Sequence, residues 1–143
     1  RLFYAIIIIA LNSALVFGQE AEFSLDKSVH KFPKTQEGVL LEHNYTVTNT
    51  GSAPLIISKY EVGCTCTKAY LPDHPILPGE SFDIRVTFDT KGKYDFQDRI
   101  IYFKTNTKKG TNSARFKLGL LVNSFRYKSN PEKFNLFFRS DNA

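Results

Sequence analysis

Two cysteines, Cys64 and Cys66, are the residues of this sequence best suited to chemistry, because only Thr65 separates them. In an extended strand such a pair points to the same face. A disulfide needs its Cβ atoms about 3.5–4.5 Å apart, closer than in an extended chain, so this bond requires a local turn. Two thiolates on one face could instead hold a soft ion such as Cu(I). A disulfide, a metal or redox site and a pair of free thiols are the three alternatives.

The three histidines, His30, His43 and His74, are the candidates for additional metal ligands. A structural zinc site would need four ligands, and His43 falls on the apolar face of a predicted strand, where a core histidine is the more common explanation. The sequence has no methionine, which argues against a methionine-rich copper carrier. We therefore expect no metal and no cofactor. In the alternative, Cys64 and Cys66 would bind Cu(I), with His43 or His74 as a third ligand.

Catalytic motifs are absent from the sequence: it contains no hydrolase, metalloprotease or phosphate-loop signature. Glu61, Asp95 and Asp98 offer carboxylates, but acidic residues are ordinary on the surfaces of strands and turns. A nucleophilic cysteine would need a base poised beside it. We therefore predict no catalytic residues and a protein that is not an enzyme.

The elements that position these residues are predicted to be strands, because apolar and polar residues alternate. Residues 81–89 are the clearest case, with an apolar side chain at every second position. The other expected strands lie at residues 21–26, 28–33, 41–47, 55–57, 101–103 and 116–122. Clusters rich in Gly, Pro and Asn separate them and are typical of turns. About seven such strands predict an all-β protein, a β-sandwich, with a β-barrel as the alternative.

The first residues read as an export signal. An apolar run over residues 2–17 follows Arg1 and ends at Gly18, before the polar Gln19. A small residue at such a boundary is typical of a signal-peptidase site, so residues 1–18 are predicted to be a signal peptide. An uncleaved anchor is the alternative, although a spanning helix needs about 20 apolar residues. The predicted location is the periplasm, the cell surface or the medium.

The remaining chain divides into two parts. Residues 19–122 carry the alternation and are predicted to form the sandwich. Residues 123–143 break that rhythm and are predicted to be a C-terminal extension, either an extra strand or a tail, with a docking segment for another protein as the alternative.

The chain is mildly basic, with 19 Lys and Arg against 14 Asp and Glu and a formal net charge of +5. No run of five like charges occurs, so we expect no nucleic-acid partner. Five basic residues of the last strands and turns are expected to gather on one edge: Lys104, Lys108, Lys109, Arg115 and Lys117. A solvated face is the common explanation of such a group, and attraction to an anionic surface polymer is the alternative.

Several short motifs occur in a familiar order. They are Asn-Thr-Gly-Ser-Ala-Pro-Leu-Ile-Ile at 49–57, Gly-Cys-Thr-Cys-Thr at 63–67, Pro-Ile-Leu-Pro-Gly-Glu at 75–80, Val-Thr-Phe-Asp-Thr at 86–90 and Thr-Asn at 105–106. Over residues 23–122 this order resembles the exported bacterial family called domain of unknown function 1573, common in Bacteroidota. The resemblance implies an immunoglobulin-like fold, similar to Hydin-type domains, and carries no activity with it. The family often has Gly where Thr65 stands here.

These observations favour an exported, non-enzymatic binding or assembly module of the cell envelope. Its partner is expected to be a protein or an envelope component, with membrane contact only through an uncleaved signal segment. The outward face of the strand at 40–48 and the loop at 63–75 are the expected contacts. The alternative is a thiol-dependent metal or redox protein that uses Cys64 and Cys66.

Overall fold

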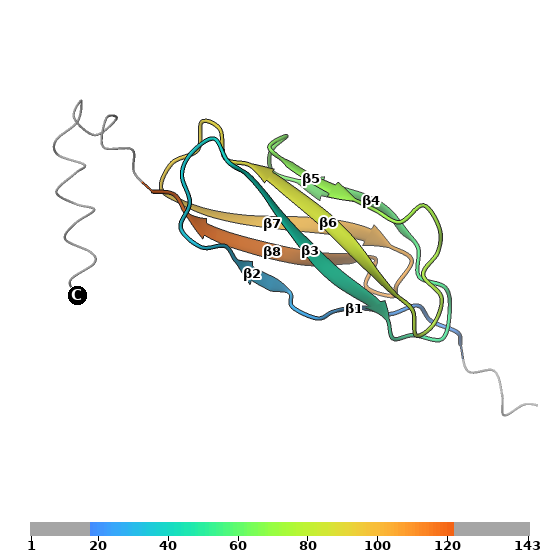
Figure 1. The fold of residues 1–143 in the computed structure, drawn as a ribbon. Coiled ribbons are helices and arrows are strands. Elements are labelled where there is room, and N and C mark those ends of the chain that lie inside the picture. Colours follow the sequence, from blue (N-terminus) through green and yellow to red (C-terminus); the bar gives the residue numbers. More distant parts are fainter. Residues whose placement is uncertain (1–17, 122–143) are drawn as a thin grey trace, which may run out of the picture.

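The computed structural model describes residues 18–121 (Figure 1), and within them eight strands form two packed sheets. The strands are β1 (Phe23–Leu25), β2 (Val29–Lys31), β3 (Leu40–Asn49), β4 (Ile57–Val62), β5 (Thr67–Tyr70), β6 (Ser81–Asp89), β7 (Phe96–Thr105) and β8 (Thr111–Gly119). The first sheet has the order β1-β3-β6-β5, and the second has the order β2-β8-β7-β4. This architecture confirms the predicted all-β, immunoglobulin-like sandwich.

Two predicted segments are left untested. Residues 1–17 and 122–143 lie outside the described residues, so the structure does not bear on the signal peptide predicted at 1–18 or on the extension predicted at 123–143.

The predicted alternation identifies which side chains point into the core between the two sheets. In the antiparallel pair of β3 and β6, Tyr45 lies opposite Ile84, and both side chains are fully buried. From the second sheet, Phe103 and Phe116 are also fully buried. The rings of Phe88 (β6) and Phe116 (β8) lie 5.1 Å apart between their centroids and join the two sheets. Because every second residue points inward, each strand buries one face and leaves the other for contacts with solvent or a partner.

Strand β5 is the element that the sequence pattern does not reveal, and it raises the number of described strands from the predicted seven to eight. It lies within the predicted loop at 63–75 and pairs antiparallel with β6. Its buried residues, Thr67 and Ala69, are small, and four residues are too few for alternation to be recognised. The strand forms because β6 offers it a partner.

Thr87 also departs from the alternation, which predicts it to be exposed. It is only 6% exposed. On the central strand β6 it lies between Glu42 of β3 and Lys68 of β5. These longer cross-strand neighbours shelter the small threonine side chain.

Asn49, at the end of β3, is fully buried and holds the turn that follows. Its Oδ1 accepts hydrogen bonds from the backbone N–H groups of Glu22 and Gly51, and its Nδ2 donates to the carbonyls of Ala53 and Ile76, both at 2.8 Å. One side chain thus satisfies four backbone groups from three segments.

Candidate functional site

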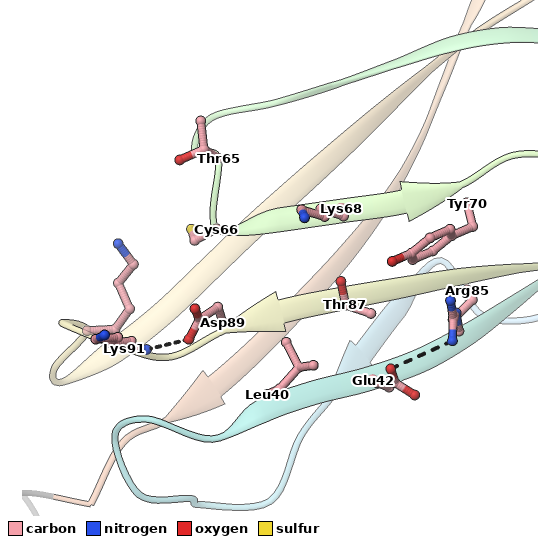
Figure 2. Close-up of a pocket in the computed structure, with 11 residues that line it drawn as sticks. Leu40, Glu42, Thr65, Cys66, Lys68, Tyr70, Arg85, Thr87, Asp89 and Lys91 are labelled. Carbon is pink, nitrogen blue, oxygen red and sulfur yellow. Dashed lines mark hydrogen bonds and ion pairs between the residues drawn. The ribbon is translucent and has the colours of Figure 1, made fainter.

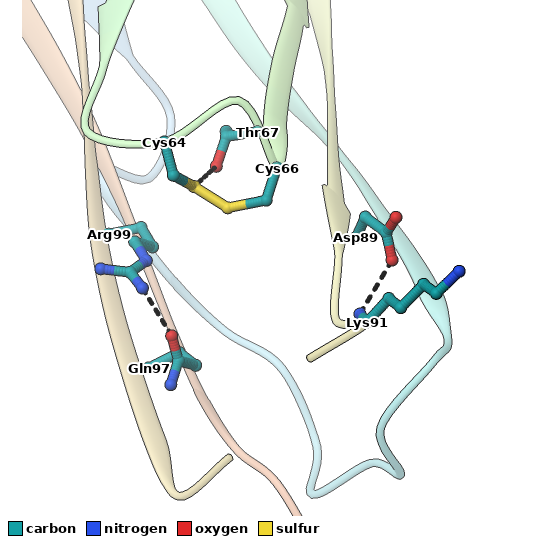
Figure 3. The surroundings of a disulfide bond; sticks show 7 residues. All are labelled: Cys64, Cys66, Thr67, Asp89, Lys91, Gln97 and Arg99. Atoms are coloured by element: carbon teal, nitrogen blue, oxygen red, sulfur yellow. Dashed lines mark hydrogen bonds between the residues drawn. A yellow bond between two sulfur atoms is a disulfide. The ribbon is translucent and has the colours of Figure 1, made fainter. Parts of the chain in front are cut away.

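The cysteine pair lies in the short connection between β4 and β5, where the chain passes from the second sheet to the first. The structure joins Cys64 and Cys66 by a disulfide, with Cα atoms 5.2 Å apart (Figure 3). Two residues of an extended strand would lie about 6.6 Å apart, so the chain turns here. The turn is held by hydrogen bonds from the N–H of Thr67 to the carbonyl of Cys64, at 3.3 Å, and from the N–H of Asp89 to the carbonyl of Cys66, at 2.9 Å.

A groove of about 570 Å³ runs over the outer face of β3, β6 and β5, and Cys66 lines one end of it (Figure 2). The remaining lining residues come from these strands, the disulfide turn and the turn after β6: Leu40, Glu42, Thr65, Lys68, Tyr70, Arg85, Thr87, Asp89, Lys91 and Lys93. The structure therefore brings the two predicted contact segments, 40–48 and 63–75, to the same surface.

The charges of the groove favour an acidic ligand. Four cationic side chains face two carboxylates, and these carboxylates already have partners. Arg85 lies with its Nη1 3.9 Å from an Oε1 of Glu42, and its guanidinium stacks 4.2 Å above the ring centre of Tyr70. Asp89 accepts a hydrogen bond of 2.9 Å from the backbone N–H of Lys91. The Nζ groups of Lys68, Lys91 and Lys93 form no ion pair within residues 18–121.

The side chains of the three histidines interact with residues other than the cysteines. His43 stacks on His30 from the opposite sheet, with ring centroids 3.5 Å apart. His74 is exposed and places its Nδ1 2.7 Å from Asp73 Oδ1. Among residues 18–121, no three His, Cys, Asp or Glu side chains form a group that could hold a metal ion. The described structure therefore does not bring His43 or His74 together with Cys64 and Cys66.

The sequence itself establishes the family. The family model described as "Protein of unknown function (DUF1573)" matches residues 23–119, which run from the first residue of β1 to the last of β8. This chain belongs to the DUF1573 family. The match confirms the resemblance found from the motifs. No curated protein matches the sequence.

Solved structures similar to this DUF1573 chain agree on the fold. A protein of unknown function from Porphyromonas gingivalis W83 superposes with a TM-score of 0.62 and 20% identity, over 76% of this chain and 50% of the other. The ASH/PapD-like domain of human CEP192 superposes with a TM-score of 0.51 and 12% identity, over 76% of this chain and 90% of that domain. The secreted serine protease VesC from Vibrio cholerae gives 0.52 and 15%, over 78% of this chain but 25% of the protease.

At these identities the likeness concerns the sandwich alone. The DUF1573 chain spans about half the length of the Porphyromonas gingivalis protein.

Within residues 18–121, no helix is long and apolar enough to cross a membrane.

The three carboxylates considered as acids lie apart from the groove. Asp98 binds Arg115, and this hydrogen bond lowers the pKa of Asp98 below its usual range. A hydrogen bond from Lys59, whose Nζ lies 3.1 Å away, likewise lowers the pKa of Glu61. Asp95 adopts a left-handed backbone conformation, with φ of 59°. Carboxylates with a lowered pKa stay ionised at neutral pH, so Asp98 and Glu61 are poorly suited to act as general acids.

The predicted basic group is partly neutralised. Arg115 and Lys117 project from β8 beside Asp98, whose Oδ2 lies 3.8 Å from Lys117 Nζ. Lys104 Nζ lies 3.9 Å from Glu61 Oε2. The group therefore offers less free positive charge than its residue types suggest.

Arg99 is the residue near the disulfide that the sequence reasoning missed. It lies on β7, on the same inward-facing side of the strand as Ile101 and Phe103. Figure 3 shows it in the surroundings of the disulfide. Its Nη2 donates to Gln97 Oε1 at 2.6 Å, while its Nε is buried without a hydrogen-bond partner. Extending the alternation of β7 back by one inward position would have found this half-buried cation.

Proposed function

We propose that this DUF1573 domain is an exported, non-enzymatic binding module of the cell envelope, whose groove over β3, β6 and β5 contacts an acidic segment of a protein partner. The groove carries the proposal, because it combines four cations, two carboxylates that already have partners and the ring of Tyr70 on one face. An aromatic ring beside an arginine is a common anchor in protein interfaces.

Four further points support this function. An immunoglobulin-like sandwich presents strand faces and turns to partners. Glu61 and Asp98, which lie outside the groove, are held in ion pairs, which suits a binding protein better than an acid–base catalyst. The apolar run at residues 2–17 supports export. One similar structure is described as a secreted protein, which agrees with such a location.

Site-specific photo-crosslinking in intact cells tests this function. A photoreactive residue at Tyr70 is expected to capture one defined protein, while the same residue at Tyr102, exposed on β7 of the other sheet, is expected to capture none. Equal capture at both positions, or capture at Tyr102 alone, would contradict the proposal.

A charge-reversal pair sharpens the test. The double change Lys68→Glu with Lys91→Glu is expected to weaken the captured complex at least about tenfold, because opposite charges steer and hold such partners. Lys108→Glu with Lys109→Glu, in the turn between β7 and β8, changes the net charge equally and is expected to have little effect. Similar losses from both pairs would show that total charge, rather than the groove, governs binding.

A further inference from the structure

We propose that the Cys64–Cys66 bond is an exchangeable disulfide that accepts two electrons from a peptide dithiol. This activity goes beyond partner binding and does not depend on which protein the groove contacts. The bond joins residues only two positions apart, so it ties no distant segments together. Closing so small a loop removes little entropy from the unfolded chain. A chemical role therefore accounts for the pair better than a structural one.

The two sulfur atoms have different surroundings. Cys66 lines the groove, whereas Cys64 does not (Figure 2). Cys64 Sγ lies 3.6 Å from Thr67 Oγ1 (Figure 3). A disulfide sulfur has no proton to donate, so the Thr67 hydroxyl is the donor in this contact. An incoming thiolate thus reaches Cys66 from the groove, and Cys64 is the leaving group.

The surroundings of Cys64 suit a departing thiolate. The Thr67 hydroxyl already donates a hydrogen bond to this sulfur, and Thr67 is only 4% exposed. Arg99 adds a positive charge in the same surroundings, with a buried Nε–H that lacks an acceptor. Within residues 18–121, no carboxylate forms an ion pair with Arg99. A hydrogen-bond donor and a nearby cation both favour the thiolate over the thiol, and a better leaving group speeds exchange.

The thiol–disulfide exchange proceeds in two steps. A substrate thiolate attacks Cys66 Sγ, a bond forms between the substrate sulfur and Cys66, and the Cys64–Cys66 bond breaks with its electron pair going to Cys64. The second thiolate of the substrate then attacks the substrate sulfur in this mixed disulfide and releases Cys66 as a thiolate, and the thiolates of Cys64 and Cys66 each take a proton from water. The substrate dithiol is oxidised to a disulfide, and the protein pair is reduced to a dithiol.

The turn allows both redox states to share one fold. The backbone hydrogen bonds from Thr67 to Cys64 and from Asp89 to Cys66 do not involve the sulfur atoms. Breaking the sulfur–sulfur bond leaves these bonds in place, so the two thiols stay close together. The reverse exchange with a disulfide then closes the pair again without unfolding.

Glutathione serves as the first probe. The full oxidised chain, mixed with excess reduced glutathione at pH 7, is expected to be reduced at a rate proportional to the glutathione concentration, with one oxidised glutathione formed per chain and an unchanged circular dichroism spectrum. A rate that does not depend on glutathione would mean that unfolding limits the reaction. That result, an absence of reduction, or a loss of the folded spectrum on reduction would overturn the proposal.

Single-cysteine variants test which sulfur is attacked. With oxidised glutathione at about pH 10, where both thiols are ionised, the Cys64→Ser variant, which keeps Cys66, is expected to form the mixed disulfide about tenfold faster than the Cys66→Ser variant, because only Cys66 lines the groove. Intact-mass measurement on quenched samples follows both reactions. Equal rates, or a faster reaction at Cys64, would overturn the assignment of Cys66.

Two substitutions test the leaving group, and both use the Cys66→Ser variant. Thr67→Val and Arg99→Met are each expected to raise the pKa of the Cys64 thiol and to slow its alkylation at pH 7 about threefold or more. Lys104→Met, on β7 but beside Glu61, is the control and is expected to leave the pH profile unchanged. A Cys64 pKa that neither Thr67→Val nor Arg99→Met changes would overturn the role given to these two residues.

Discussion

The imidazole rings of His30 and His43 stack with their centroids 3.5 Å apart and their planes 13° from parallel. His30 lies on β2 of the second sheet and His43 on β3 of the first, so the stack bridges the two sheets. The ring of Phe32 packs in a T-shaped arrangement against His30, with ring centroids 4.5 Å apart, and the ring of Tyr45 packs in the same way against His43, with centroids 4.7 Å apart. A pair of neutral rings fits this space, whereas two charged rings would repel each other.

The histidine stack predicts a fold that weakens in mild acid. Partial burial, and then the charge of Lys27, lower the pKa of His30 below its ordinary value of 6.5. Partial burial, followed by His30, lowers that of His43, although Asp26 opposes the shift. As pH falls below 6.5, the unfolded chain therefore binds protons before the folded one, and the free energy of unfolding drops until the lower folded pKa values are passed.

Urea unfolding at pH 7.5 and pH 5 measures this drop, with the double change His30→Phe and His43→Phe as control. The control is expected to lose little stability over the same range. The ion pair of Asp98 acts elsewhere, because a lowered carboxyl pKa costs stability only as pH falls below about 4. A wild-type protein that is as stable at pH 5 as at pH 7.5 would contradict this account of the stack.

Asn49 provides a second prediction. The change Asn49→Asp replaces an amide donor by a carboxylate oxygen that faces the carbonyls of Ala53 and Ile76. Because the position is fully buried, the free energy of unfolding is expected to fall by about 3 kcal/mol or more. Asn44→Asp makes the same chemical change on the exposed face of β3 and is expected to cost less than about 0.5 kcal/mol. Denaturant midpoints of the two variants that differ little would argue against the buried network.

The strand register predicts a contrast between inward and outward positions. Phe88 and Leu118 are each only 1% exposed, so replacing either by Ala is expected to cost about 2–5 kcal/mol. Asp83→Ala, on the outward face of β6, is expected to cost about 0.5 kcal/mol or less. Urea unfolding compares the variants. Equal costs would indicate a register shifted by one residue, since such a shift exchanges the two faces.

Removing the disulfide is expected to leave the fold in place. The double change Cys64→Ser with Cys66→Ser opens a loop of three residues, for which loop entropy amounts to less than about 2 kcal/mol. Thermal unfolding followed by circular dichroism measures the loss. A variant that fails to fold would show that the bond holds the β4–β5 turn, contrary to the account of its backbone hydrogen bonds.

Export predicts a defined mature N-terminus. If signal peptidase cuts after Gly18, N-terminal sequencing of the chain expressed with its complete leader and recovered from the exported fraction is expected to begin at Gln19. The whole apolar segment retained on a membrane-bound chain would instead indicate an anchor.

Much of the fold could be predicted from local pattern. The alternation at residues 81–89 and 41–47 places Phe88 and Tyr45 inward, as the structure confirms, because a strand's side chains change face at every residue. Thr87 breaks the pattern, since its burial depends on residues from two neighbouring strands. For the candidate site, the sequence pointed to Cys64, Cys66 and both segments that line the groove, but not to Arg85 or to the turn after β6.

Local sequence features are enough to identify this chain as an all-β member of the DUF1573 family with one cysteine pair, because strand periodicity, turn residues and short motifs are properties of neighbouring positions. The existence of β5, the stacking of His30 on His43 and the position of Arg99 near the disulfide arise from tertiary packing. Each of these depends on segments far apart in the chain. The spacing of residues along one strand carries no information about which strand will pack beside it, and that choice is made when the two sheets bury their apolar faces together.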